Sequence, residues 1–183
     1  MIYTIGHGDR SIEEFVGLLK DAEIECLVDV RAFPASRRHP QFALASLESS
    51  LAGAGIRYVW EGTALGGRRK PEPDSPHLAL RNPGFRAYAD HMMSETFREG
   101  LARLIGLGSA TPAAIMCAER LPWRCHRYLL ADSLVARGVR VFHLVSPGQR
   151  KEHALNQLAR VNGERLVYDT GEQPPLEIGD DHV

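Results

Sequence analysis

The stretch IYTIGHGDRSIEEFVGLLKDAEIECLVDVR, residues 2–31, predicts a strand, a helix and a second strand. Its first six residues, IYTIGH, form an apolar run, and Ser11 and Glu14 have the spacing of a capping box at a helix start. The apolar residues of this helix share one face: Ile12, Phe15, Val16 and Leu19. CLVDVR (26–31) then predicts the next strand. Parallel neighbours need a crossover connection, so this order favours two parallel strands joined through a helix.

The same alternation continues along the chain. Further strands are predicted at 56–60, 113–119 and 139–145, and helices at 44–55, through a long amphipathic segment at 85–105, and at 125–138. HALNQLARV (153–161) predicts another helix and ERLVYD (164–169) an edge strand. We therefore expect a Rossmann-like α/β fold with three layers, in which helices flank a mostly parallel sheet of about five strands. One domain is expected over 1–168, with a loose tail at 169–183.

Bulk composition excludes several classes of protein. With 183 residues, 44% of them hydrophobic, the chain can form one core. A formal net charge of −1 argues against binding nucleic acid or membranes by bulk charge. Three cysteines without a disulfide-like pattern, no signal peptide and no bilayer-spanning run indicate a cytoplasmic protein with no membrane partner. The oligomeric state is not indicated.

Polar residues follow the predicted strands at their carboxyl ends. They are His7, Asp29, Arg31, Glu61, Cys117, Glu119 and His143. Ligands bind at this edge of open α/β sheets, so we expect these side chains to converge on one crevice. Asp29 and Arg31 lie on the same side of their strand. They form either a structural ion pair, or a general base or metal ligand beside an anion contact.

The segment MCAERLPWRCHRYLLA (116–131) concentrates reactive side chains. Cys125 and His126 begin a predicted helix, where unpaired N–H groups together with Arg124 and Arg127 suit a phosphate or a carboxylate. The same field is expected to lower the pKa of Cys125. Two chemistries follow: a cysteine nucleophile with His126 or His7 as base, or a soft metal held by Cys117, Cys125 and a histidine. A purely structural role for either thiol remains an alternative.

Two loops carry further basic residues towards the same edge. SRRHP (36–40) and GGRRK (66–70) suit phosphate recognition, and Gly66 and Gly67 permit close approach of the backbone to a ligand. The segment 61–84 is long enough to serve as a lid. Its length and its content of Gly, Pro and charge favour a functional loop.

Several ordered motifs resemble one family. TIGHG, LVDVRAFPASRRHPQF, LGGRR, NPGFRAYADHM and MCAERLPWRCHRYLLADSLVARGVRVFHL are similar to the DUF488 family of uncharacterised bacterial and archaeal proteins, over about residues 2–153. The resemblance implies a compact cytosolic α/β domain without an assigned reaction. Gly8 and Tyr128 depart from the family pattern, which usually has serine at the first position and often at the second. The matching motif positions are His7, Asp29, Arg31, Pro34, Ser36, Gly66, Gly67, Cys117, Glu119, Pro122, Cys125, His126, Arg127, His143 and His153.

These observations predict a small enzyme with an anion- or phosphate-binding crevice and a nucleotide- or nucleic-acid-derived substrate. The catalytic candidates are His7, Asp29, Glu119, Cys125 and His126. The binding candidates are Arg31, Ser36, Arg37, Gly66, Gly67, Arg68, Arg124 and Arg127. The cofactor is not identified, although Cys117, Cys125 and His126 are candidate metal ligands. The alternatives are a non-catalytic nucleic-acid or nucleotide-binding module, and a metal- or redox-sensing protein built on cysteine and histidine.

Overall fold

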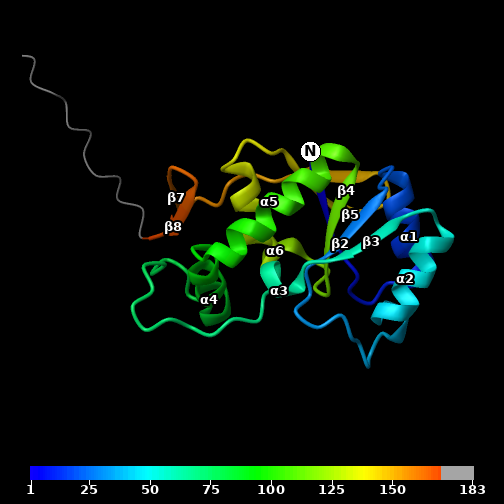
Figure 1. Ribbon diagram of the computed structural model, residues 1–183, viewed down its shortest axis with the longest axis horizontal. Coiled ribbons are helices and arrows are strands. Elements are labelled where there is room, and N and C mark those ends of the chain that lie inside the picture. The colour runs from blue at the N-terminus through cyan, green and yellow to red at the C-terminus, as the bar shows by residue number, and fades with distance from the viewer. Residues whose placement is uncertain (170–183) are drawn as a thin grey trace, which may run out of the picture.

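The computed structural model describes residues 1–169, and a six-stranded sheet is its central layer (Figure 1). The strand order is β3-β2-β4-β1-β5-β6. The first five strands in the chain run parallel, and β6 pairs with β5 in antiparallel fashion. The strands are β1 (Ile2–Gly6), β2 (Cys26–Asp29), β3 (Arg57–Trp60), β4 (Ala113–Cys117), β5 (Val141–Ser146) and β6 (Gln149–Glu152).

Helices cover both faces of this sheet (Figure 1). They are α1 (Ile12–Asp21), α2 (Leu44–Gly53), α3 (Gly62–Leu65), α4 (Pro83–Met92), α5 (Glu95–Ala110) and α6 (Arg127–Val135), with 3₁₀ turns at η1 (Pro40–Phe42) and η2 (Pro122–Arg124). One core cluster joins Ile115 of β4 to α4, α5 and α6, and a second joins Met116 to α1 and α2. The three-layer α/β prediction is therefore confirmed. Within residues 1–169, no helix has the length and apolar character needed to cross a membrane.

Helix α1 shows why the local predictions succeed. Ser11 Oγ accepts from Glu14 N at 3.1 Å, and Ser11 N donates to the Glu14 carboxylate at 3.0 Å, which completes the predicted capping box. Phe15 and Leu19 on its apolar face are fully buried. Local spacing therefore determined both where this helix begins and which face it buries.

One helix prediction was wrong. Residues 153–161 form no helix; the chain instead enters a hairpin of β7 (Ala159–Asn162) and β8 (Arg165–Tyr168). Asn162 pairs with Arg165, so the two-residue turn is Gly163-Glu164, and Gly163 at its first position adopts the positive φ of 59° that such a turn requires. The amphipathic segment predicted at 85–105 is helical apart from Met93 and Ser94. It is divided into α4 and α5, because Ser94 Oγ accepts from Phe97 N and begins α5 anew. All but one residue of the tail predicted at 169–183 lies outside the described residues.

Candidate functional site

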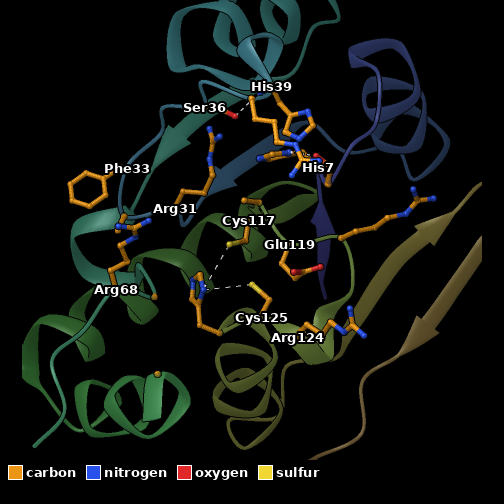
Figure 2. A pocket seen from close by; sticks show the side chains of 18 of the residues that line it. His7, Arg31, Phe33, Ser36, His39, Arg68, Cys117, Glu119, Arg124 and Cys125 are labelled. Carbon is orange, nitrogen blue, oxygen red and sulfur yellow. Dashed lines mark hydrogen bonds between the residues drawn. The ribbon is translucent and has the colours of Figure 1, made fainter. Parts of the chain in front are cut away.

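A cavity of about 800 Å³ opens at the carboxyl edge of the sheet, where His7, Arg31 and Cys117 lie at the ends of β1, β2 and β4 (Figure 2). The crevice predicted at this edge is therefore present. It brings together ten of the predicted site residues: His7, Arg31, Ser36, Gly67, Arg68, Cys117, Glu119, Arg124, Cys125 and His126. Asp29, Arg37, Gly66 and Arg127 are not among its lining residues.

Asp29 lies behind the cavity wall and is bound to Arg31. The Arg31 guanidinium donates to both carboxylate oxygens, with an Nη2 to Oδ2 distance of 2.6 Å, and the Tyr58 hydroxyl donates to Oδ2 at 2.8 Å. Burial alone would lower the pKa of Arg31, but the hydrogen bonds and charge of Asp29 outweigh it and raise that pKa. Because both oxygens of Asp29 are occupied, the pair is the structural ion pair that the sequence left as an alternative.

Arg127 is also used internally. Its side chain is almost fully buried, and it donates from Nη1 to the Glu119 carbonyl at 2.5 Å and from Nη2 to the Arg120 carbonyl at 2.8 Å. Gly6 allows this contact, because a Cβ there would lie 1.9 Å from the Glu119 carbonyl oxygen. Arg127 therefore holds the loop after β4 in place.

Two of the polar residues at strand ends point elsewhere. Glu61 accepts two hydrogen bonds from Arg103 on α5, at 2.8 and 2.9 Å. His143 hydrogen bonds to Thr4 at 2.7 Å and to His153 at 2.9 Å within the core. Neither lines the cavity, so the crevice draws on fewer strands than the sequence predicted.

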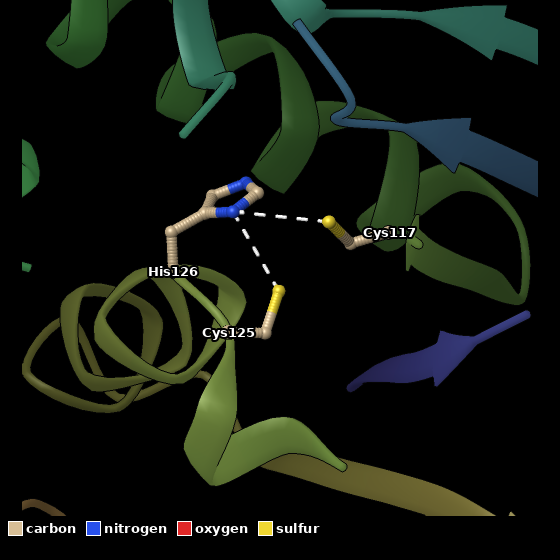
Figure 3. Close-up of side chains that lie close together, drawn as sticks. All are labelled: Cys117, Cys125 and His126. Atoms are coloured by element: carbon tan, nitrogen blue, oxygen red, sulfur yellow. Dashed lines mark hydrogen bonds between the residues drawn. The ribbon is translucent and has the colours of Figure 1, made fainter. Parts of the chain in front are cut away.

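Two thiols and one imidazole of the cavity lining lie close together (Figure 3). The Nδ1 atom of His126 lies 3.8 Å from Cys117 Sγ and 3.6 Å from Cys125 Sγ. Both cysteines are buried, and the edge of the Tyr88 ring packs on the imidazole. Gly67 permits this packing, because a Cβ there would lie 2.4 Å from Nδ1. The glycine therefore makes room for a side chain of the protein itself.

The two thiols differ in acidity. A hydrogen bond from Cys125 is the largest influence on Cys117 and, with the nearby His126, outweighs burial and lowers the pKa of Cys117 well below its usual range. Burial and the neighbouring Cys117 raise the pKa of Cys125. The prediction that the helix start lowers the pKa of Cys125 was therefore wrong. Cys125 precedes α6, which begins at Arg127, and burial outweighs the field expected there.

His7 occupies the opposite wall of the cavity as a neutral ring. Its Nδ1 donates to the Gly8 carbonyl at 2.9 Å, which leaves Nε2 as an acceptor. The ring stacks on Phe42 with centroids 4.3 Å apart. Burial lowers the pKa of His7, so the imidazole is uncharged near neutral pH.

The sequence prediction missed several lining residues. Arg38 and His39 lie beside Ser36 in the quoted SRRHP motif, and Phe33 and Phe85 also line the cavity. Phe33 is 66% exposed, and the Arg68 guanidinium lies 5.6 Å from its ring centroid. The basic composition of the loop indicated that it could line the cavity. It did not show which of its side chains point into the cavity. Neither tryptophan of the chain, Trp60 or Trp123, lines the cavity.

Comparison with known proteins agrees with the motifs. A family model described as a domain of unknown function, DUF488, matches residues 11–134. No significant match was found among the curated proteins or among the solved structures. The matched region begins after His7 and includes both thiols and the arginine loops. Since it covers well over half of the 183 residues, the chain belongs to the DUF488 family.

Proposed function

We propose that this protein is a small enzyme that binds a phosphate-bearing substrate in the cavity. One observation carries the proposal: one open cavity is lined both by several arginines and by a neutral histidine whose Nε2 is an acceptor. Binding groups and a proton acceptor at one edge of a parallel sheet are the parts of a catalytic site.

The arginines supply the anion-binding groups. Among residues 1–169, Arg38, Arg68 and Arg124 form no ion pair with an acidic side chain, although all three line the cavity. Arg31 also lines the cavity, but its guanidinium donates to Asp29 and to the Phe42 carbonyl, so its contribution is positive charge at the wall. Guanidinium groups bind phosphate oxygens in a fork geometry, so a phosphate is the ligand that fits this set best.

The aromatic lining favours a nucleotide or a nucleic-acid-derived substrate. Phe33 exposes most of its ring at the cavity and lies next to Arg68, and Phe85 lines the same space. A base can stack on such a ring while the arginines hold its phosphate. This combination supports a nucleotide over a small inorganic anion.

Proton transfer is assigned to His7 and Glu119. His7 is neutral and has a free acceptor nitrogen, and Glu119 is an exposed carboxylate of the lining. Asp29 is a positioning residue in this scheme, because its oxygens are already bound by Arg31 and Tyr58. The reaction class is acid–base chemistry on a phosphate-bearing substrate.

A non-catalytic nucleotide or nucleic-acid-binding module is the second candidate. The exposure of Phe33 beside arginines favours it, since single strands bind to stacking platforms in basic grooves. Such a module would lose affinity steeply as salt increases and would not depend on His7.

The test measures binding of AMP, ADP and a short single-stranded oligonucleotide by calorimetry, followed by product analysis. We expect Arg38→Ala and Phe33→Ala to weaken binding about tenfold or more, because a charge-assisted hydrogen bond contributes roughly 1.5–3 kcal/mol and base stacking about 1–3 kcal/mol. Leu78→Ala, an exposed apolar residue outside the lining, is the control. His7→Gln should retain binding and lose turnover. Binding that Arg38→Ala leaves unchanged would refute the anion site, and turnover that survives in His7→Gln would refute the assigned base.

A further inference from the structure

The cluster of Cys117, Cys125 and His126 has the donor set of a zinc site. Its three donor atoms, two sulfurs and one nitrogen, lie within 4.8 Å of one another. Figure 3 shows both Sγ atoms directed at Nδ1 of the imidazole. Two thiolates and an imidazole are borderline-soft ligands of the kind that zinc prefers.

The distances agree with tetrahedral coordination. Zinc bonds of about 2.3 Å to sulfur and about 2.0–2.1 Å to nitrogen, at the tetrahedral angle, separate those two ligand atoms by about 3.6 Å. The observed Sγ to Nδ1 separations are 3.6 Å for Cys125 and 3.8 Å for Cys117. Both sulfur-to-nitrogen distances therefore match those of a tetrahedral zinc ion.

The surrounding structure holds these ligands in position. Cys117 is the last residue of β4, and the amide of Cys125 donates to the Pro122 carbonyl at 3.0 Å. Arg127 braces the intervening loop through the carbonyls of Glu119 and Arg120. The strand end and the braced turn hold the ligands in position before an ion arrives. Such preorganisation favours metal binding.

We propose that Cys117, Cys125 and His126 bind a zinc ion whose fourth coordination position opens into the cavity. This deepens the proposed function, because all three ligands line the cavity assigned to the substrate. Two thiolates and a neutral imidazole balance the charge of Zn²⁺. Three protein ligands with one open position are typical of catalytic zinc, whereas closed structural sites have four. Glu119, two residues after Cys117 and in the same lining, is the carboxylate nearest in sequence to receive a proton from water held there.

One feature of His126 predicts how tightly the ion is held. Its Nε2 atom is buried and has no hydrogen-bond partner among residues 1–169. Zinc-binding histidines usually donate this second N–H to a carboxylate or carbonyl, and loss of such partners typically costs about 10–100-fold in affinity. We therefore expect a chelator to remove the zinc without unfolding the protein.

The experiment uses the full chain, purified anaerobically with a phosphine reductant and made metal-free with a chelator. Titration with Co²⁺ should give one equivalent of tetrahedral cobalt with thiolate charge-transfer bands, and Zn²⁺ should displace it. Cys117→Ala and Cys125→Ala should weaken binding at least about 100-fold, more than the loss of an outer partner does. Cys26→Ala is the matched control, because Cys26 is an equally buried cysteine at the far end of β2. It should bind as wild type does.

The titration of the wild-type protein with Co²⁺ and Zn²⁺ tests the zinc site even if a variant fails to fold. No stoichiometric metal, octahedral cobalt without thiolate bands, or metal that persists in both Cys117→Ala and Cys125→Ala would overturn the zinc site. AMP binding by the metal-free protein separates the two proposals. Arg38-dependent AMP binding without zinc uptake would remove the zinc site alone, whereas zinc uptake without AMP binding would remove the anion site alone.

Discussion

At the scale of single residues, the internal partners of charged side chains decide which groups remain for a ligand. Asp29 is fully buried, and its oxygens are bound by Arg31 and Tyr58. The Arg127 guanidinium likewise donates its hydrogen bonds to backbone carbonyls. Arg38 and Arg124, in contrast, line the cavity and form no ion pair among the described residues. The number of charged residues in the sequence therefore does not show which of them are bound internally.

The buried pair gives a stability prediction. Asp29→Asn removes the negative partner of a buried guanidinium, and breaking such a pair typically costs about 3–5 kcal/mol. We expect the free energy of unfolding, measured by urea denaturation, to fall by roughly that amount. Glu152→Gln, which breaks an exposed pair with Arg140, should lower the free energy of unfolding far less, because solvent screens that pair. Equal losses in the two variants would contradict the structural role of Asp29.

At the scale of elements, a buried polar chain ties the C-terminal hairpin to the sheet. Thr4 of β1 bonds to His143 of β5, His143 to His153, and His153 to Asp132 of α6 at 2.8 Å. The Tyr168 hydroxyl of β8 donates to the same carboxylate at 2.8 Å. Asp132 also accepts from the amide of Asn156. These bonds hold residues 153–156 in a non-helical path. Together with the Gly163-Glu164 turn, they explain why the predicted helix is absent.

The burial of His143 in this row of hydrogen bonds predicts how the free energy of unfolding depends on pH. Burial lowers the pKa of His143 from 6.5 to about 3. Between these two values the unfolded chain binds a proton at this position and the folded protein does not, so the unfolding free energy must decrease as pH falls. We expect this loss in urea denaturation between pH 6.5 and 5, above the range where most carboxylates titrate. His143→Gln should be less stable at pH 7 and show a shallower dependence on pH. An unchanged slope would exclude His143 as its source.

The hairpin turn supplies a second prediction at this scale. Gly163→Ala places a Cβ on a residue with φ of 59°, a conformation that costs an L-residue roughly 1–2 kcal/mol. Gly17→Ala is the matched control, because this glycine lies inside α1 with open space around it. The control should stabilise the protein by about 0.5–1 kcal/mol. Thermal unfolding of both variants gives the comparison, and a stabilising Gly163→Ala would contradict the turn geometry.

At the scale of the whole molecule, stacking two core layers on one parallel sheet brings the strand ends together. Ile115 and Met116 of β4 belong to different clusters, one under α4, α5 and α6 and the other under α1 and α2. The cavity opens where β1, β2 and β4 end between these layers. Distant segments of the sequence, around 7, 31, 67 and 117–126, become neighbours only through this arrangement.

Both layers should therefore unfold together. Ile115→Ala and Met116→Ala each remove a fully buried side chain, which typically costs about 2–5 kcal/mol. We expect each variant to unfold in a single transition, with its midpoint at a lower guanidinium concentration than in the wild type. Far-ultraviolet circular dichroism measures this midpoint. Val161→Ala, at a site that is 46% exposed in β7, should change the free energy of unfolding by less than about 0.5 kcal/mol. Separate transitions for the two core variants would show that the layers are not one cooperative unit.

The sequence by itself determined the α/β class, the order of the strands and helices from β1 to β5, and the edge of the sheet that carries the site. It could do so because side-chain periodicity and capping are local, and because parallel strands end at one edge. Only the tertiary structure decided that His126 lies against both Cys117 and Cys125, that Asp29 and Arg127 are bound internally, and that Arg38 and Phe33 line the cavity. The physical reason is that burial, side-chain direction and choice of partner depend on contacts between segments far apart in the chain.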